Sequence, residues 1–441
     1  MINYQLFACS FIKKSYFCNP NPHKMSQNNK LHILSLFLLL TGCITLSAQN
    51  VSSDSILIDY FEDLDVPTTY HNKVHLLKSG NDKFIDLFEH IRQAKHHIHL
   101  EYFNFRNDSI ARAVFALLGE KAKEGVKVRA MFDAFGNMSN NRPLKEEHLA
   151  AIRAKGIEIV KYDPIRFPWV NHIFNRDHRK IVVIDGKIGY TGGMNIADYY
   201  IEGLPEIGEW RDMHVRIEGE AVSYLQDIFL TIWNASTGQE VEGSEYFPFV
   251  FNKNYDRRDN IGVAIVDRAP RKSNKIMRQA YIHSLDAAKN KVQIINPYFV
   301  PTNSIKQAIK RTLKRGVEVE IMIPGASDIP FTPDAAMYTV NSLRKKGANV
   351  YIYNNGFHHS KIMMVDSLFC TVGSTNLNSR SLRFDYEVNA FIFNRETTDE
   401  LIQMFEEDKK NSIYLTRDIY MKQTIWKRFV AWFAHLFTPV L

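Results

Sequence analysis

Cysteine is scarce in this 441-residue chain, and so are long apolar runs and an excess of one charge. The four cysteines, Cys9, Cys18, Cys43 and Cys370, are too few and too scattered for a disulfide framework or a paired-cysteine zinc site. No apolar run reaches the ~18–20 residues that a spanning helix needs, which excludes a multi-pass membrane protein. The 55 Lys and Arg against 48 Asp and Glu leave a net charge of +7, too weak for a histone-like nucleic-acid binder.

The composition that is present is that of a globular protein. Hydrophobic residues make up 45% of the chain and charged residues 23%, which excludes a disordered chain. The length equals roughly three typical domains, so the chain can form two substantial lobes or one large one. The mild positive charge is compatible with an anionic phosphate substrate or an anionic membrane surface, and no nucleic acid is expected as a partner.

The amino-terminal segment is predicted to direct the protein to its location and not to join the fold. Residues 33–46 are nearly all apolar, and about 14 residues suit the apolar region of a signal peptide. Within them Leu40-Thr41-Gly42-Cys43 is similar to a bacterial lipobox, whose cysteine becomes lipidated. Cleavage after Ala48 and an uncleaved anchor are the alternatives. We expect a protein of the bacterial cell membrane that is exported or lipid-anchored at Cys43, and that starts at Met1 or Met25.

Two halves of the remaining chain carry the same order of features. Each has an amphipathic helix, an alternating strand that ends in an aromatic pair, a second helix and a Gly-Val strand. The features recur about 190 residues later, a period that indicates two copies of one α/β domain and not a solenoid. The expected segments are an extension with the signal (1–48), a linker (49–72), a first domain (73–250), a second domain (251–415) and a carboxyl-terminal amphipathic helix (416–441).

One set of chemically active residues occurs once in each half. The first copy has His178, Lys180 and Asp185, followed by Gly192-Gly193-Met194-Asn195. The second copy has His359, Lys361 and Asp366, followed by Gly373-Ser374-Thr375-Asn376. In both copies the lysine follows the histidine by two positions, the aspartate follows the lysine by five, and the first glycine follows the aspartate by seven. Chance does not place two such extended patterns at corresponding positions of a repeat.

The spacing predicts a shared pocket. The apolar run after each lysine is a strand, and because residues two apart on a strand share one face, histidine and lysine point together. Two copies packed face to face would place two imidazoles and two ammonium groups in one pocket. That set suits phosphoryl transfer without a metal or another cofactor, since one histidine attacks phosphorus and the other protonates the leaving oxygen. The groups expected to hold the phosphate oxygens are the lysines with Asn195, Asn376, Gly193 and Ser374.

The paired motifs resemble the phospholipase D superfamily over roughly residues 75–441. Further segments are similar to its bacterial cardiolipin synthase branch: Trp210–Gly219, Asn296–Pro301, Asn376–Ser381, Phe384–Asn389 and Pro439–Leu441. The resemblance implies two similar α/β lobes related by a pseudo-twofold axis, with the active site at their interface. It also implies a phosphohistidine enzyme at a membrane surface that joins two molecules of phosphatidylglycerol, an anionic phospholipid, into cardiolipin and glycerol. A hydrolytic phospholipase D, another phosphodiesterase or nuclease of the superfamily, and a non-enzymatic surface lipoprotein are the alternatives, and the oligomeric state stays open.

The resemblance assigns roles within the motifs. By family precedent Asp212 orients His178, Glu387 orients His359, and His178 is the nucleophile while His359 is the acid. The motif carboxylates Asp185 and Asp366 belong to the catalytic signature, but each is expected to end a strand, with Asp185 in a hairpin turn. Arg179 would keep His178 neutral if it reached the pocket, although strand alternation points it to the opposite face.

Other histidines and aromatic residues carry weaker signals. The cluster of His96, His97 and His99 alternates on a strand without a set of carboxylates, so no metal is expected. Cys370 is expected to be a small buried hydrophobic residue. The residues that could line either the pocket or the core are His172, His214, Phe167 and Trp169, and His358 is expected to support the site only indirectly.

The carboxyl-terminal segment predicts an amphipathic helix. Its apolar positions fall on one helical face, namely Trp426, Phe429, Val430, Phe433, Leu436 and Phe437. Lys422, Lys427 and Arg428 lie on other sides. An aromatic face with basic flanks is typical of a helix that lies in a bilayer interface, and packing on the second lobe is the alternative.

Overall fold

The computed structural model describes residues 52–164, 174–248, 260–270, 272–273, 275–330 and 332–436. The expected signal segment with its lipobox, and also Phe167, Trp169 and His172, lie outside the described residues. Within the described part, no helix combines the length and the apolarity that crossing a bilayer requires. The chain from Ser53 onward forms one compact unit.

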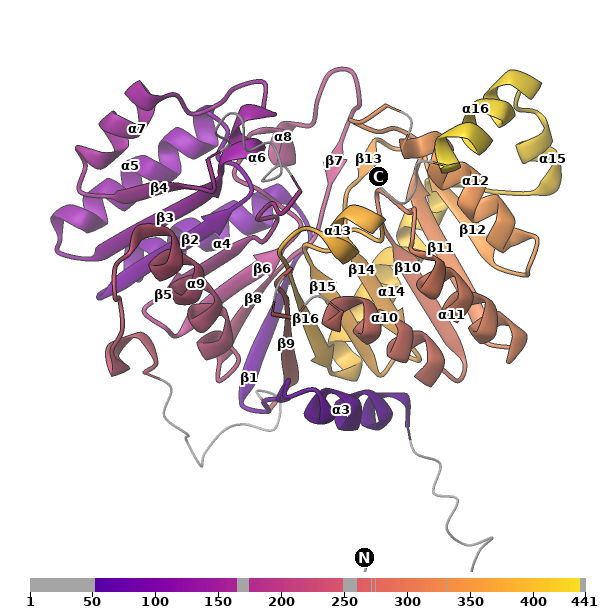
Figure 1. Ribbon diagram of the computed structural model, residues 1–441, viewed down its shortest axis with the longest axis horizontal. Coiled ribbons are helices and arrows are strands. Elements are labelled where there is room, and N and C mark those ends of the chain that lie inside the picture. Colours follow the sequence, from indigo (N-terminus) through magenta and orange to yellow (C-terminus); the bar gives the residue numbers. More distant parts are fainter. Residues whose placement is uncertain are drawn as a thin grey trace, which may run out of the picture. The chain divides into compact units, whose positions relative to one another are not determined.

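Two mixed β-sheets with the same strand order are the framework of this unit (Figure 1). The first sheet runs β1 (Asn72–Leu77), β8 (His214–Gly219), β6 (Ile188–Gly192), β5 (Ile181–Ile184), β2 (His97–Tyr102), β3 (Lys127–Asp133) and β4 (Glu158–Tyr162). The second runs β9 (Gly262–Arg268), β16 (Glu387–Phe393), β15 (Phe369–Gly373), β14 (Ile362–Val365), β10 (Lys291–Ile295), β11 (Glu318–Pro324), β12 (Asn349–Tyr353) and the additional β17 (Ser412–Tyr414). In the first sheet β2, β3 and β4 are parallel to one another, and in the second sheet β10, β11 and β12 are. All other neighbouring strands of the two sheets are antiparallel. The prediction of two similar α/β lobes is confirmed.

Helices cover both faces of each sheet, and the central strands β5 and β14 are accordingly apolar at every position. In β5, Val182 and Ile184 pack toward one set of helices, while Ile181 and Val183 pack on the opposite face. The helices of the first lobe are α4 (Gly80–Gln93), α5 (Ser109–Lys123) and α7 (Glu146–Arg153) on one face and α9 (Val222–Thr237) on the other. Their counterparts in the second lobe are α10 (Ile276–Ala287), α11 (Asn303–Lys314) and α12 (Thr332–Arg344), and then α14 (Arg395–Lys410).

The faces that carry α9 and α14 form one hydrophobic core shared by the two lobes. Apolar side chains of β5, β8 and α9 lie in the same cluster as those of β14, β16 and α14. Because this core is continuous across the lobes, the two sheets are held side by side as a single body.

Part of the expected linker at 49–72 is instead a helix. Ser53–Asp63 form helix α3, whose Leu57 and Phe61 are fully buried in the core of the second lobe. The Phe61 ring packs edge-on against Phe391 of β16, with ring centroids 5.1 Å apart. The helix therefore belongs to the second lobe, although the sequence that follows it enters the first.

The motif aspartates end a strand in each lobe, as predicted. Asp185 and Asp366 lie at the turns after β5 and β14, both with φ of 54°. The Asp366 carboxylate accepts three backbone N–H bonds, of 2.7 to 2.8 Å, from Lys289, Asn290 and Lys291. Asp185 accepts the equivalent three from residues 95–97. Each carboxylate thus fastens a hairpin to the entry of the neighbouring parallel strand. Neither aspartate lines the active-site cavity, and because both carboxylates are committed to backbone N–H groups, we expect a structural and not a catalytic role for them.

We expect Asp366→Ala to lower the free energy of unfolding by about 2–3 kcal/mol, because three N–H groups lose a charged acceptor. Asp366→Asn keeps one acceptor oxygen and tolerates positive φ, so its loss should be smaller. Denaturant unfolding followed by circular dichroism measures both, with the exposed Asp59→Ala on α3 as the control. A D366A protein with unchanged stability and abolished turnover would return this residue to the catalytic set.

Candidate active site

The two motif histidines lie in the segments that immediately precede β5 and β14, and not on the strands as predicted. His178 and Lys180 come just before Ile181, and the Lys180 Nζ donates to the carbonyl of His178 at 2.6 Å. Lys361 makes the matching contact with the His359 carbonyl at 2.5 Å. Each lysine therefore folds back beneath its own histidine. The two side chains of a motif reach the same site although they precede the strand and do not lie on it.

Short backbone pairings between the lobes hold both histidine segments. Strand β13 (Phe357–His358) pairs with β7 (Trp210–Arg211) of the first lobe, and the His359 N–H donates to the Arg211 carbonyl at 2.6 Å. On the other side, the His178 N–H donates to the Tyr386 carbonyl at 3.0 Å. Each histidine is thus tied to the segment of the opposite lobe that leads into Asp212 or Glu387.

The orienting carboxylates are crossed, which corrects the pairing that the resemblance implies. The Nδ1 of His178 lies 3.1 Å from Glu387 Oε1, and the Nδ1 of His359 lies 2.7 Å from Asp212 Oδ2. Both carboxylates are fully buried. The physical reason is the backbone pairing between the lobes, which places each carboxylate beside the histidine of the opposite lobe.

Gly193 and Ser374, expected to bind phosphate, instead accommodate these carboxylates. A side chain at Gly193 would come within 2.2 Å of Asp212 Oδ1, so glycine is required for the close approach of that carboxylate. At the equivalent position, Ser374 donates its hydroxyl to Glu387. Neither residue lines the cavity, whereas Asn195 and Asn376 do.

Burial sets the protonation of the two histidines, and the carboxylates make them different. Burial, Lys180 and Lys361 together lower the pKa of His178 well below its usual value. Burial and Lys361 also lower the pKa of His359, but Asp212 opposes the shift. Although burial alone would raise it, Lys361 and His359 hold the pKa of Asp212 below its ordinary value, so this carboxylate stays ionised.

Glu387 and the two lysines titrate near neutrality. Burial raises the pKa of Glu387 to about 7. Burial lowers the pKa of Lys180 to about 7 and that of Lys361 to about 8. The Lys361 Nζ lies 3.0 Å from both ring nitrogens of His359. At neutral pH each of these three groups is therefore close to its own pKa.

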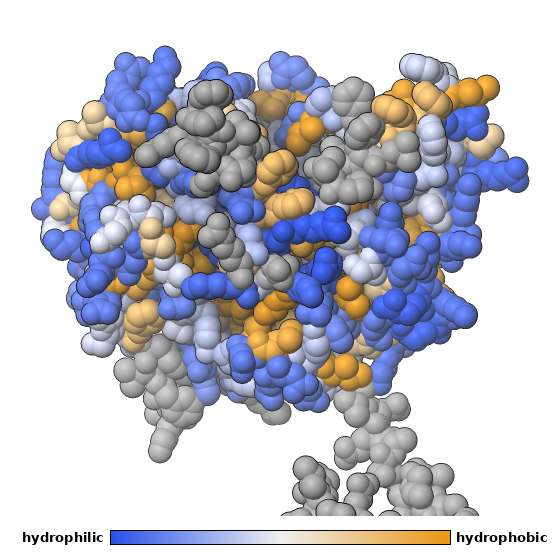
Figure 2. Space-filling view, in the orientation of Figure 1, coloured by the Kyte–Doolittle hydropathy of each residue, from blue (hydrophilic) through white to orange (hydrophobic). Residues whose placement is uncertain are grey.

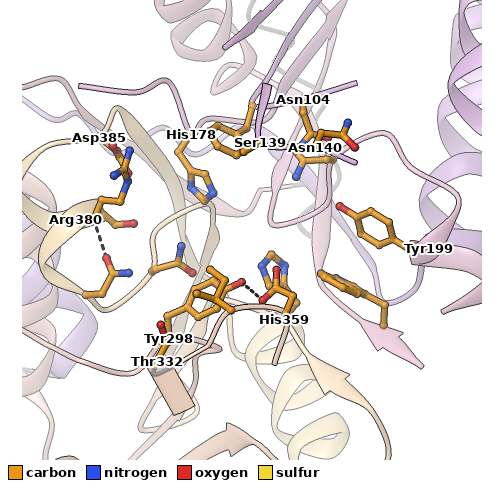
Figure 3. Close-up of a pocket in the computed structure, with 18 of the residues that line it drawn as sticks. Asn104, Ser139, Asn140, His178, Tyr199, Tyr298, Thr332, His359, Arg380 and Asp385 are labelled. Atoms are coloured by element: carbon orange, nitrogen blue, oxygen red, sulfur yellow. Dashed lines mark hydrogen bonds and ion pairs between the residues drawn. The ribbon is translucent and has the colours of Figure 1, made fainter. Parts of the chain in front are cut away.

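A cavity of about 660 Å³ opens between the lobes above these groups. Figure 3 shows the rings of His178 and His359 in the middle of it, with Tyr199 to the right and Arg380 with Asp385 to the left. Sequence reasoning did not single out several residues of its wall, among them Asn104, Arg106, Asn140, Tyr199, Asp328 and Arg380. Most lie on connecting segments that differ between the two halves, so the repeat gives no signal for them.

Lys83 of α4 supports the site from behind and was also missed. It is fully buried, and its Nζ donates to the carbonyls of Met194 and Asn195, both at 2.9 Å. It thereby fixes the backbone that carries Asn195 to the cavity. The basic residue on an otherwise apolar face of α4 was the available signal.

Several other residues that the sequence singled out lie outside the cavity lining. Arg179 points away from the cavity, as alternation predicted, and pairs with Glu101 and Asp267. His97 and His99 are bridged by Gln226 in the core, and the described residues hold no group of three or more potential metal ligands. Cys370, His214 and His358 are all buried, and none of them lines the cavity. The Nε2 of His358 lies 3.0 Å from Asp408 Oδ2.

Comparison with known proteins gives consistent matches. The family model described as cardiolipin synthase, PLD-like domain, matches residues 87–233 and 281–409. Cardiolipin synthase 2 of Staphylococcus epidermidis is 36% identical over 376 residues, covering 85% of this chain and 75% of the relative. The major cardiolipin synthase ClsA of Bacillus subtilis is 35% identical over 374 residues, covering 85% and 76%. Among solved structures, phosphatidylserine synthase of Haemophilus influenzae has a TM-score of 0.68 at 14% identity and covers 87% of this chain and 100% of that one, which shows the fold alone.

We expect a narrow pH optimum near neutrality for kcat/KM on a phosphodiester substrate. As the pH rises through 7 to 8, Lys180 and Lys361 lose their charge, so affinity for an anion falls. As the pH falls through 7, Glu387 takes up a proton and stops stabilising charge on His178. Initial rates measured from pH 5 to 10 test this, and Glu387→Gln should lower the plateau and remove the acid limb. An acid limb that persists in E387Q would assign it to another group.

Proposed function

This chain belongs to the cardiolipin synthases of the phospholipase D superfamily, and from that premise we propose that it transfers a phosphatidyl group between two phosphatidylglycerol molecules. The products are cardiolipin and glycerol. One observation carries the proposal: a single cavity holds two imidazoles, each oriented by a buried carboxylate of the opposite lobe. That arrangement supplies a nucleophile and a proton donor to one phosphate without further groups.

The first half-reaction forms a covalent intermediate on His178. Its Nε2 attacks the phosphorus of the first phosphatidylglycerol while Glu387 supports the charge that develops on the ring. The bond to the glycerol headgroup breaks, and the His359 imidazolium gives its proton to the leaving oxygen. Glycerol departs, and phosphatidyl-His178 remains beside a neutral His359.

The second half-reaction reverses these roles. A hydroxyl of the acceptor phosphatidylglycerol gives its proton to His359 and attacks phosphorus, and the bond to His178 Nε2 breaks. Lys180 and Lys361 lie beneath the two histidines, where their charge lowers the energy of the anionic transition state. Cardiolipin leaves, and both histidines return to their starting states.

The carboxylates support this assignment of roles. The ionised Asp212 at 2.7 Å favours the imidazolium on His359, which an acid requires, and so counters the lowering of the His359 pKa by burial and Lys361. Glu387 has a pKa of about 7 and therefore stabilises an imidazolium on His178 less, which suits a nucleophile that must start neutral. Arg179, which pairs elsewhere, contributes nothing to the choice.

We expect His178→Ala and His359→Ala each to reduce cardiolipin formation by at least about a thousandfold, because either loss removes one half of the acid–nucleophile pair. Lipid analysis of a cardiolipin-free host expressing each protein measures this, with the exposed His96→Ala as the control. A variant of either residue that keeps more than about a tenth of the activity would contradict the two-histidine chemistry.

Two further measurements distinguish the roles of the histidines and the identity of the acceptor. Rapid quenching in a neutral denaturant with phosphatidylglycerol labelled at its phosphate, followed by peptide mapping, should place the label on His178, and a label on His359 alone would reverse the roles. Phosphatidic acid in place of cardiolipin would show a hydrolytic phospholipase D with the same site.

We also propose that helix α16 (Ile425–Leu436) places the enzyme on the surface of the bacterial membrane. Its small side chains Ala431 and Ala434 are buried and pack the helix on α12, whereas Trp426, Phe429 and Trp432 are 71%, 48% and 43% exposed. One side of the helix therefore packs on the second lobe, and the other leaves aromatic side chains exposed for the bilayer contact that we propose. Leu436 and Phe437 of the expected face lie outside the side chains that the structure describes.

The position of α16 fits a substrate that resides in a bilayer. Its apolar atoms gather at the upper right of Figure 2, where Figure 1 labels α16 beside α12 and the short α15 (Arg417–Met421). The first residue of α12, Thr332, lines the active-site cavity. Exposed Lys422 and Lys427 lie next to this face, as expected for contact with anionic headgroups.

We expect Trp426→Ser combined with Phe429→Ser to weaken binding to phosphatidylglycerol vesicles by about tenfold or more, since two large side chains lose their apolar burial. Cosedimentation measures the effect, and Ile85→Ser, at an apolar side chain of the first lobe that is 69% exposed, is the matched control. Equal binding of the double variant and the control would exclude α16 as the contact surface.

A further inference from the structure

The active-site cavity holds a second cationic group apart from the histidine and lysine cluster. Arg106, between β2 and α5, lines the cavity and is 7% exposed. Its Nε has no hydrogen-bond partner, and its carboxylate contact in the described part of the chain is Asp108 at 4.0 Å, the limit for an ion pair. The Asp108 oxygens already accept N–H bonds from Ala111 and Asp198. A buried arginine with so little compensation is costly unless a ligand brings an anion.

The other arginine of the cavity shows the contrast. Arg380 donates from Nε to Asp385 at 3.1 Å, and Asp385 lines the cavity beside it. The Nε of Arg380 thus has a carboxylate partner at hydrogen-bond distance, whereas the Nε of Arg106 has none. The Arg106 backbone is also fixed, because its N–H donates to the Ile196 carbonyl next to Asn195. The main chain is therefore fixed at the point from which the Arg106 side chain lines the cavity.

A chain of aromatic contacts connects Arg106 to the side of His359. The guanidinium carbon lies 5.4 Å from the Tyr199 ring, Tyr199 packs on Trp210 at 4.4 Å, and Trp210 lies 5.5 Å from the His359 ring. Under the proposed function, His359 serves the glycerol side of the reacting phosphate in both half-reactions. Groups along this wall therefore face whatever is attached to the acceptor hydroxyl.

The acceptor phosphatidylglycerol differs from free glycerol by its own phosphodiester, which does not react. In cardiolipin one glycerol separates the two phosphates, so both must fit the cavity when the new bond forms. We propose that Arg106 binds the unreacting phosphodiester of the acceptor lipid, while the histidines and lysines hold the phosphate that is transferred. The fork of N–H donors of arginine matches phosphate oxygens. This inference rests on the proposed function and adds a second anion subsite to it.

The test compares two acceptors that share a hydroxyl but not a phosphate. In mixed micelles, one assay follows cardiolipin formation from phosphatidylglycerol, and the other follows exchange of labelled free glycerol into phosphatidylglycerol. Arg106→Gln should lower the first rate relative to the second by about tenfold to a hundredfold, because a charge-assisted contact is lost only for the lipid acceptor. Arg106→Lys, which keeps a cation, should restore part of the ratio. Arg112→Gln, at an exposed arginine of α5 outside the cavity, should leave both rates unchanged.

The outcomes separate this inference from the function on which it rests. Equal losses in both assays, or an unchanged ratio in R106Q, would overturn the acceptor subsite and leave cardiolipin synthesis intact. A wild type that exchanges glycerol but forms no cardiolipin would overturn the proposed function, and the subsite with it. Thermal unfolding of R106Q in parallel shows whether an equal loss comes from damage to the fold.

Discussion

The backbone pairing of short segments across the lobe interface is the constraint on which the site depends. Residues 209–211 pair with 357–359, and residues 176–178 pair with Tyr386. Each pairing positions one histidine and, one residue further along the partner segment, the carboxylate that holds it. Orientation, tautomer and charge of both imidazoles thus follow from the docking of the lobes and not from either lobe alone.

Charge is confined in this site because the same docking buries it. Two lysines and two carboxylates lie behind the histidines, all removed from water, where electrostatic interactions are stronger than at a surface. Burial brings the pKa values of Lys180, Lys361 and Glu387 close to neutral pH. The arrangement resembles a preformed solvation shell for a phosphate, and its cost in stability is offset by the large apolar cores on either side.

Much of this architecture is predictable from the sequence because it depends on local patterns. The repeat and its strand and helix periods predict two α/β lobes, and the spacing of His178 and His359 predicts their common pocket. The crossed carboxylates are not predictable in this way, since Asp212 and Glu387 follow their own motifs in the chain and only the tertiary docking decides which imidazole each meets. Helix α3 was missed because its partner surface, the second lobe, is remote in sequence. Arg106 was missed because it lies on a connection without a counterpart in the repeat.

The continuous core beneath the two sheets also limits how the enzyme can protect its chemistry. Side chains of both lobes interlock there, so a hinged closure of one lobe on the other would have to break the core. We therefore expect that no rigid-body movement of one lobe on the other seals the cavity. Under the proposed function, shielding of the covalent intermediate would then fall to the incoming lipid, whose headgroup would fill the mouth while its acyl chains stay in the bilayer. Fidelity against hydrolysis becomes a property of substrate supply: a crowded membrane favours transfer, and a depleted one admits water.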